Sequence, residues 1–224
     1  LDAKASRIWL LDLEEGEAQQ LFDYDVALHS PLWAPRGQRL AYMSPTIPGV
    51  EIYDLDTGEL QQYANEWGAP PTWSPEGSRL VLPELMMAGE DLAVRLVRID
   101  LEAEHLIDIS GDDDFVRDVA PAWSPGGGWI AFGRQFLDDE RWTPGRQIWL
   151  TRPDASEAYG LPGVAMADHY ALAWRPDGGA LAYARADLSQ GPQVVPDVSV
   201  WVFDFEPGEP RAVGQGAVLP RWLP

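Results

Sequence analysis

The stretch Pro71-Thr72-Trp73-Ser74-Pro75-Glu76-Gly77-Ser78-Arg79-Leu80-Val81-Leu82 decides the fold, because it recurs along the chain. Related stretches begin at Pro31, Pro121 and Ala173, and a shorter one begins at Pro220. In the four longer copies a tryptophan precedes a proline and a glycine, which suit a tight turn, and an apolar triplet, which suits a strand. The repeated tryptophans, which we assign to structural packing, are Trp33, Trp73, Trp123, Trp174 and Trp222. They lie 40, 50, 51 and 48 residues apart, a spacing typical of β-propeller blades.

Each repeat is followed by further segments that suit strands, such as 50–55, 94–99, 147–150 and 198–203. We therefore predict an all-β fold, a single-domain β-propeller (1–224) of about five blades, each a four-stranded antiparallel sheet. The predicted blade units are residues 23–63, 64–110, 111–162 and 163–213. Residues 1–22 resemble the third and fourth strands of a blade, so we expect them to share a closing blade with residues 214–224.

Composition excludes several classes of function. The 224 residues carry a formal charge of −20, which disfavours nucleic acid and anionic membrane surfaces as partners. The sequence has no cysteine, so disulfides, thiol nucleophiles and thiolate metal sites are excluded. There is no apolar run of transmembrane length, so we expect no direct membrane insertion, and we expect a monomer.

The repeats resemble the TolB-like β-propeller repeat, whose hallmark is Trp-Ser-Pro-Asp-Gly. The stretches that carry the resemblance are Trp73-Ser74-Pro75-Glu76-Gly77, Trp123-Ser124-Pro125 and Trp174-Arg175-Pro176-Asp177-Gly178. The resemblance implies a propeller fold, a partner-binding role and an extracytoplasmic location, which means periplasmic, secreted or surface-tethered. Similar repeats also form the propeller of prolyl-oligopeptidase-like serine peptidases.

The length of the connections predicts which face binds. From the repeat tryptophan to the next strand there are always 7 positions, whereas from the second to the third strand the separation grows from 10 to 17. Long loops on a rigid scaffold are where binding usually resides, so we expect the binding site on the face with the long connections. We assign Met86-Met87, the run from Arg134 to Trp142 and residues 189–193 to these long loops.

The segments that link the blades add acidic, basic and aromatic residues that blade symmetry would bring to the mouth of the central channel. Together with Arg134 and Trp142, the candidate binding residues are Asp23, Asp25, His29, Glu66, Trp67, Asp112, Asp113, Asp114, Arg117, Asp168, His169 and Tyr170. Acidic and aromatic side chains together suit a cation, a sugar or a basic peptide. Ordinary solvated surface would also explain most of the acidic residues.

Catalytic signatures are absent from the sequence. It contains no nucleophile elbow, phosphate loop or zinc signature, and Asp112-Asp113-Asp114 lacks the spacing of a calcium loop. We therefore predict no cofactor, with calcium as the one cation considered, and a non-catalytic scaffold that binds a protein or peptide of basic character. The alternatives are an accessory substrate-gating propeller of a larger serine hydrolase, or a carbohydrate- or metal-binding propeller. Paired carboxylates also leave glycoside hydrolysis open.

Overall fold

The computed structural model describes residues 7–23, 27–44 and 48–222, and every regular element in these residues is a β-strand. A hairpin, β1 (Trp9–Leu11) and β2 (Ala18–Gln20), precedes four antiparallel meanders. Meander 1 holds β3 (His29–Trp33), β4 (Arg39–Met43), β5 (Val50–Asp54) and β6 (Leu60–Tyr63). Meander 2 holds β7 (Thr72–Trp73), β8 (Arg79–Ala88), β9 (Asp91–Asp100) and β10 (His105–Asp108). Meander 3 holds β11 (Val116–Trp123), β12 (Ile130–Phe136), β13 (Gln147–Thr151) and β14 (Ala158–Gly160). Meander 4 holds β15 (Ala167–Trp174), β16 (Ala180–Asp187), β17 (Val198–Asp204) and β18 (Glu209–Gln215).

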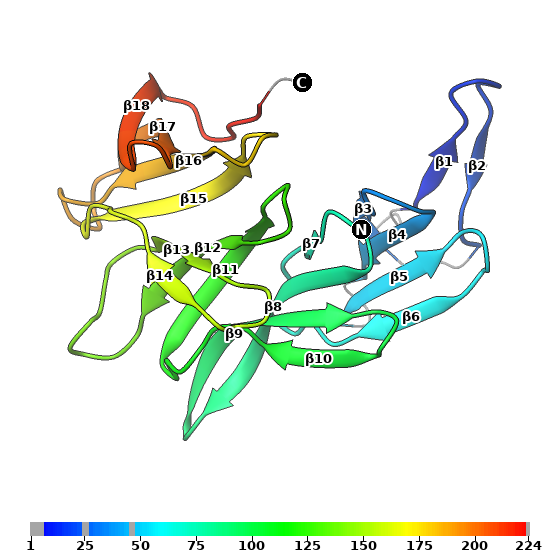
Figure 1. Ribbon diagram of the computed structural model, residues 1–224, viewed down its shortest axis with the longest axis horizontal. Coiled ribbons are helices and arrows are strands. Elements are labelled where there is room, and N and C mark those ends of the chain that lie inside the picture. The colour runs from blue at the N-terminus through cyan, green and yellow to red at the C-terminus, as the bar shows by residue number, and fades with distance from the viewer. Residues whose placement is uncertain (1–6, 24–26, 45–47, 223–224) are drawn as a thin grey trace.

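The meanders follow one another around a common centre. Figure 1 shows meander 1 on the right, meander 2 below, meander 3 on the left and meander 4 above. The first strands of all four border this centre, because one cavity touches Leu32, Thr72, Ala122 and Ala173. Meanders 2 and 3 are also joined by a parallel bridge between Val94 and Arg117. The all-β prediction is confirmed.

The repeated turn explains why glycine recurs at one place. Gly37, Gly77, Gly127 and Gly178 have φ of +78°, +76°, +74° and +76°, values that side chains with a Cβ rarely adopt. In meander 2 the backbone N–H of Ser74 donates to the carbonyl of Arg79 (2.9 Å) and closes the turn. The Ser74 hydroxyl accepts the N–H of Arg79 in return (3.1 Å), which orients the next strand.

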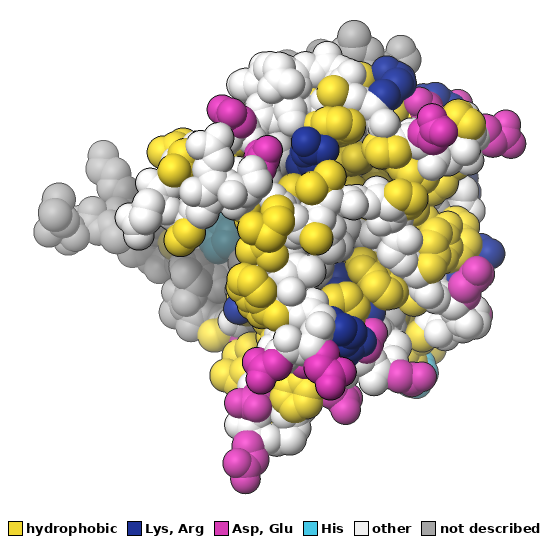
Figure 2. Space-filling view, turned by 90° about the vertical axis from the view of Figure 1, so that its left-hand side faces the viewer, with side chains coloured by type: hydrophobic (Ala, Val, Ile, Leu, Met, Phe, Trp, Pro, Cys, Tyr) yellow, Lys and Arg dark blue, Asp and Glu magenta, His cyan; other side chains and the backbone are white. Residues whose placement is uncertain are grey.

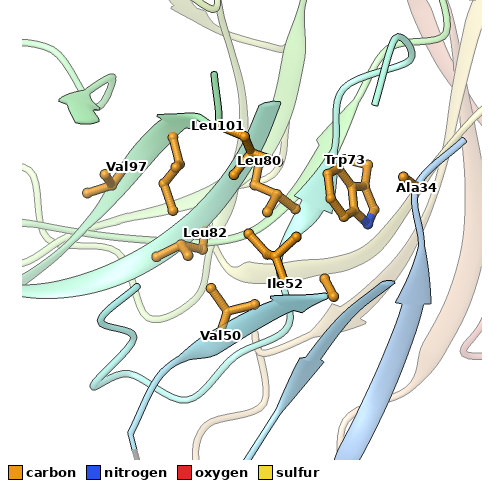
Figure 3. Close-up of a cluster of buried hydrophobic side chains, with 10 residues drawn as sticks. Ala34, Val50, Ile52, Trp73, Leu80, Leu82, Val97 and Leu101 are labelled. Atoms are coloured by element: carbon orange, nitrogen blue, oxygen red, sulfur yellow. The ribbon is translucent and has the colours of Figure 1, made fainter. Parts of the chain in front are cut away.

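The repeated tryptophans connect neighbouring meanders. The indole N–H of Trp73 donates to the carbonyl of Leu32 (3.0 Å), and that of Trp174 donates to the carbonyl of Ala122 (2.9 Å). Both carbonyls belong to the residue before the tryptophan of the preceding meander. Trp123 differs, because its indole donates to Gly127 within its own turn (3.1 Å). Figure 3 shows Trp73 packed among aliphatic side chains of meanders 1 and 2, namely Val50, Ile52, Leu80 and Leu82.

The first strand of a meander carries a β-bulge three residues before its tryptophan. Ser30, Ala120 and Ala171 occupy this position with φ of +54°, +53° and +55°, and the strand ladder shifts register there. In meander 2 the same position is Pro70, whose ring holds φ negative and which has no N–H to donate. This explains why β7 is only two residues long.

Both ends of the described chain repeat hydrogen bonds that are found in the meanders. In the β1–β2 hairpin the N–H of Gly16 donates to the carbonyl of Asp12 (2.9 Å), as Gly58 donates to Asp54 in the β5–β6 turn (2.8 Å). At the other end, the indole of Trp222 donates to the carbonyl of Ala173 (2.9 Å), which repeats the contact between meanders. Residues 217–222 are not in a strand, however, and they have no ladder with β1 or β2.

One predicted loop is a strand pair. The assignment of Met86-Met87 to a loop is wrong, because both lie in β8, which pairs with β9 as far as Ala88 and Asp91. Only Gly89 and Glu90 connect the two strands. The extra length of the second repeat therefore lies in a long hairpin that leaves Met87 66% exposed.

Candidate functional site

A cavity of about 880 Å³ lies between the segment that precedes β7 and the first strands of meanders 3 and 4, β11 and β15. Two positions of the repeat, counted from its tryptophan, line the cavity in three successive repeats. Six residues before the tryptophan stand Trp67, Arg117 and Asp168, and four residues before it stand Ala69, Val119 and Tyr170. The remaining lining residues are Pro70, Ala120, Gln135, Pro144, Gly145, Arg146, Ala186, Leu188, Pro196 and Val198.

The cavity opens on the face with the long connections. The β12–β13 and β16–β17 connections emerge at the left of Figure 1, and Figure 2 looks onto that side. Figure 2 shows basic and hydrophobic side chains in the hollowed middle of this face, while acidic side chains lie mainly towards its edge. The centre of this face is therefore less acidic than the chain as a whole.

Arg117 is the exposed cation of the cavity. Its NH1 donates to Oε1 of Gln135 (3.3 Å), and its guanidinium carbon lies 5.8 Å from the ring centre of Trp67. Among the described residues no carboxylate forms an ion pair with it. The positive charge of Arg117 is thus held in place by neutral groups and remains available to an anion.

Arg146 and Asp168 form a pair on the cavity wall. The backbone N–H and Nε of Arg146 donate to Oδ1 of Asp168 (2.8 and 2.7 Å), and its NH2 donates to Oδ2 (2.5 Å). Burial tends to raise the pKa of the Asp168 carboxyl, but the hydrogen bonds and charge of Arg146 outweigh it and lower the pKa. Gly145 permits this contact, because a Cβ there would lie 2.7 Å from the carbonyl oxygen of Ala167. The pair is electrically neutral, and both oxygens of Asp168 are occupied.

His169 lies behind the cavity wall and is only 2% exposed. Its Nδ1 lies 2.8 Å from the carbonyl oxygen of Arg146 and therefore donates a proton to it, while its ring lies 5.6 Å from that of Tyr183. Burial lowers the pKa of the imidazole. The structure thus places His169 as a packed neutral side chain, away from the candidate ligand.

Arg134 is also placed differently from the prediction, which had it in a binding loop. It lies in β12 and is 1% exposed. Its Nε and NH2 donate to the two carboxylate oxygens of the buried Asp118 (2.8 and 2.6 Å), and its NH1 donates to Asp113 (3.0 Å). The guanidinium lies 4.7 Å from the ring centre of Trp149. Arg134 is therefore part of the interior and cannot reach a ligand in the cavity.

The other candidate residues do not line the cavity. Asp113 pairs with Arg134 and with Arg141 (2.5 Å), and so ties the β12–β13 connection to the segment before β11. Asp25 lies outside the described residues. The exposed candidates that lie elsewhere on the surface are Asp23, His29, Glu66, Asp112, Asp114 and Trp142. Of the fourteen candidates, the structure gathers Trp67, Arg117, Asp168 and Tyr170 in one cavity.

Sequence reasoning placed Gln135 in a long loop without choosing it as a binding residue, and it missed Arg146. Gln135 adjoins the predicted Arg134, and strand alternation places its side chain on the opposite face, towards the cavity. Arg146 ends the long β12–β13 connection, whose path no sequence pattern reveals. The signal available for Gln135 was the alternation of β12, had that strand been extended to Phe136.

The donors at the cavity do not fit a metal ion. Asp168 has both oxygens bound to Arg146, and His169 directs its Nδ1–H to a carbonyl. Among the described residues no three His, Cys, Asp or Glu side chains gather where they could hold a metal. In the same part of the chain no helix is long and apolar enough to cross a membrane.

Comparison with known proteins yields no matching family model. A curated relative is the Tol-Pal system protein TolB of Alcanivorax borkumensis, 29% identical over 86 residues, which are 36% of this chain and 20% of the relative. The chain thus matches about a fifth of the length of this relative.

Solved structures share the fold over almost the whole chain. Oligogalacturonate lyase in complex with manganese has a TM-score of 0.68 at 21% identity, and the match covers 93% of this chain and 59% of the lyase. TolB from Acinetobacter baumannii has a TM-score of 0.62 at 16% identity, with 96% and 51% covered. A prolyl endopeptidase has a TM-score of 0.68 at 14% identity, with 95% and 33% covered. The predicted TolB-like propeller is confirmed as a fold, and the chain spans about half the length of the lyase and TolB structures or slightly more.

These structures correct three predictions. The expectations of a non-catalytic scaffold and of no enzymatic activity are wrong, because proteins with this fold include oligogalacturonate lyase, which is an enzyme. The expectation of no cofactor is overturned by the manganese of that lyase. The physical reason for the error is that the repeats of a propeller specify its fold, whereas its function depends on the side chains on its surface. The lack of familiar catalytic motifs therefore says little about activity.

Proposed function

Because the chain has the fold of TolB-like propellers, we propose that it is the substrate-binding propeller of an enzyme and that its cavity binds an acidic carbohydrate. The observation that carries this proposal is Arg117, an exposed cation in a chain of net charge −20 that no described carboxylate neutralises. A carboxylate on a ligand would supply the charge-assisted hydrogen bonds that a guanidinium forms best.

The aromatic side chains of the cavity support a sugar as the rest of the ligand. Trp67 is 38% exposed, and Tyr170 lies with Arg146 above its ring at 5.5 Å. Aromatic surfaces combined with a few directed polar groups are typical of small-ligand sites, and Gln135 and Arg117 are such groups here. The name oligogalacturonate lyase supports the same class, because galacturonate carries one carboxylate per sugar.

The test compares binding of oligogalacturonate with binding of its neutral methyl ester by calorimetry. We expect the acid to bind more tightly than the ester in the unmodified chain. Arg117→Gln should remove this preference, whereas Arg36→Gln, an exposed arginine outside the cavity, should leave it unchanged. Trp67→Ala should weaken both ligands, while the matched variant Trp142→Ala should weaken neither. Equal affinity for acid and ester in the unmodified chain would contradict the proposal.

The finer architecture is also a proposal: five blades in a ring, with the fifth formed by both ends of the chain. The turn of the β1–β2 hairpin matches that between the third and fourth strands of meander 1. Trp222 repeats the hydrogen bond between neighbouring meanders, as a first strand would. The chain has no cysteine, so labels on cysteines introduced at Gln19 and Val218 can report the distance between them. A short, single distance is expected, and a long or broad one would argue for an open arc.

Location and blade boundaries remain predictions of the same kind. We propose an extracytoplasmic location, which the similarity to a Tol-Pal system protein supports. The proposed blade units 23–63, 64–110 and 111–162 each contain the strands of one meander, and unit 163–213 contains those of meander 4 except the last two residues of β18. Fractionation of cells that express the full-length gene product would test the location.

A further inference from the structure

We infer that Gln135 sets the preference of the cavity for anions, because it holds Arg117 in position without neutralising it. The inference rests on the proposed function and names a positioning residue of that same site. Gln135 lies in β12 directly opposite Arg117 in β11, so the two side chains share one face of meander 3. Both line the cavity.

Two hydrogen bonds fix the orientation of the Gln135 amide. Its Oε1 accepts from NH1 of Arg117 (3.3 Å), and its Nε2 donates to the carbonyl oxygen of Thr143 (2.8 Å). A flipped amide would direct its NH2 at the guanidinium and its oxygen at a carbonyl, which are two mismatched contacts. Gln135 therefore presents a hydrogen-bond acceptor to Arg117. Through its second hydrogen bond it also links Arg117 to the β12–β13 connection.

Arg117 differs from the three arginines of β12 and the β12–β13 connection, which are Arg134, Arg141 and Arg146. The neighbouring pair of the same ladder is Asp118 and Arg134, and there a carboxylate faces the guanidinium. Arg146 is paired with Asp168, and Arg141 with Asp113 and Asp138. Of these four arginines, Arg117 is the one whose partner is an amide, and the other three are each bound by a carboxylate.

The amide has a physical consequence for ligand binding. A carboxylate at position 135 would form an internal ion pair with Arg117, since the two residues face each other across the ladder. An anionic ligand would then have to displace that pair. The neutral amide leaves the charge of Arg117 for the ligand while limiting the freedom of its side chain.

The experiment compares Gln135→Glu with Gln135→Met. Gln190→Glu, an exposed residue in the β16–β17 connection on the same face, controls for added negative charge, and melting temperatures verify folding. The first readout is the side-chain Nε–H resonance of Arg117 during a titration with acetate, which needs no sugar. The second is the ratio of affinities for oligogalacturonate and its methyl ester.

We expect acetate to shift the Arg117 resonance in the unmodified chain and in Gln190→Glu, but not in Gln135→Glu. Gln135→Glu should weaken acid binding about tenfold or more, the size of a lost charge-assisted hydrogen bond, while ester binding changes little. Gln135→Met should keep the preference for the acid but with weaker binding, because the charge remains and its anchor is lost.

Two results would overturn the inference, both in Gln135→Glu: an undiminished response of the Arg117 resonance to acetate, or an unchanged ratio of acid to ester affinity. A merely structural role would lower both affinities together and leave the ratio as it was. If acetate acts on Arg117 as expected but no sugar binds the unmodified chain, the inference is supported and the proposed function fails.

Discussion

Replacing Asp118 with asparagine should cost the fold several kcal/mol. Asp118 is fully buried, and both of its carboxylate oxygens accept from the guanidinium of Arg134, which is 1% exposed. Burial raises the pKa of the Asp118 carboxyl, and the guanidinium opposes that rise. In Asp118→Asn the guanidinium would keep its charge in the interior and would have an amide donor group placed against its own N–H groups.

The magnitude follows from what remains around Arg134. Breaking a buried ion pair by removing one partner costs about 3–5 kcal/mol. Asp113 still contacts the guanidinium at 3.0 Å, and the carbonyl of Ser110 accepts at 2.5 Å, so we expect the lower end, about 3 kcal/mol. For a chain of this length, about 2–4 °C per kcal/mol gives a melting temperature lower by roughly 6–12 °C.

Urea unfolding measures this cost, provided that the dependence of the unfolding free energy on urea is unchanged in the variant. Arg211→Gln is a suitable control, because it breaks an ion pair with Asp204 whose arginine is 60% exposed, and such pairs contribute about 1 kcal/mol or less. Removing both charges in Asp118→Leu with Arg134→Met should cost less than the sum of the single changes. A loss below about 1 kcal/mol for Asp118→Asn would refute the view that the buried charge of Arg134 depends on Asp118 for its compensation.

Three further predictions concern the same framework. Burial lowers the pKa of His169 below the usual 6.5, so this imidazole binds a proton more tightly in the unfolded chain than in the folded one. The stability of the fold should therefore hold above about pH 6.5 and fall as the pH drops below that value. His169→Gln should flatten this pH dependence, as measured by urea midpoints across that range. Ala120→Gly should leave the fold unchanged in stability or stabilise it by up to about 1 kcal/mol in thermal unfolding, because φ of +53° strains alanine. The control Ala131→Gly, within β12, should cost about 0.5–1 kcal/mol. Equal losses in the two variants would contradict the view that Ala120 is strained. Trp73→Phe should cost about 1–3 kcal/mol, because it loses the hydrogen bond to Leu32 and buried volume. The exposed control Trp142→Phe should cost almost nothing. Equal melting temperatures of the two variants would argue against a stabilising tryptophan contact between meanders.

The sequence predicts most of the framework because each repeat carries its own turn chemistry. The glycines of the repeated turn need positive φ, and the tryptophans recur at one register, so the four meanders follow from local pattern alone. The long β8–β9 hairpin does not. Residues 84–93 show no alternation of polar and apolar side chains, and Pro83 argues against a strand interior. The hairpin forms because β8 and β9 pair along their whole length, which is tertiary information.

For the candidate site, symmetry predicts positions but not partners. Trp67, Arg117, Asp168 and Tyr170 meet because equivalent positions of successive meanders face one axis. Arg134 was misplaced because a charged residue after an apolar triplet resembles a loop, whereas here β12 continues and Asp118 compensates its charge. Which arginine is neutralised depends on contacts across the ladder and across connections, and no local pattern in the sequence contains them.

The net charge of the chain suggests a basic partner, yet the exposed group in the cavity is a cation. The two observations are compatible because charges more than about 8 Å apart are largely screened at physiological salt. A ligand in the cavity therefore responds to the groups that it touches. The carboxylates of Asp168, Asp118 and Asp113 are each bound by an arginine, so none of these three opposes an anion beside Arg117. An acidic protein therefore favours an acidic ligand where its own nearby carboxylates are bound by arginine, and Asp168, Asp118 and Asp113 meet that condition beside Arg117.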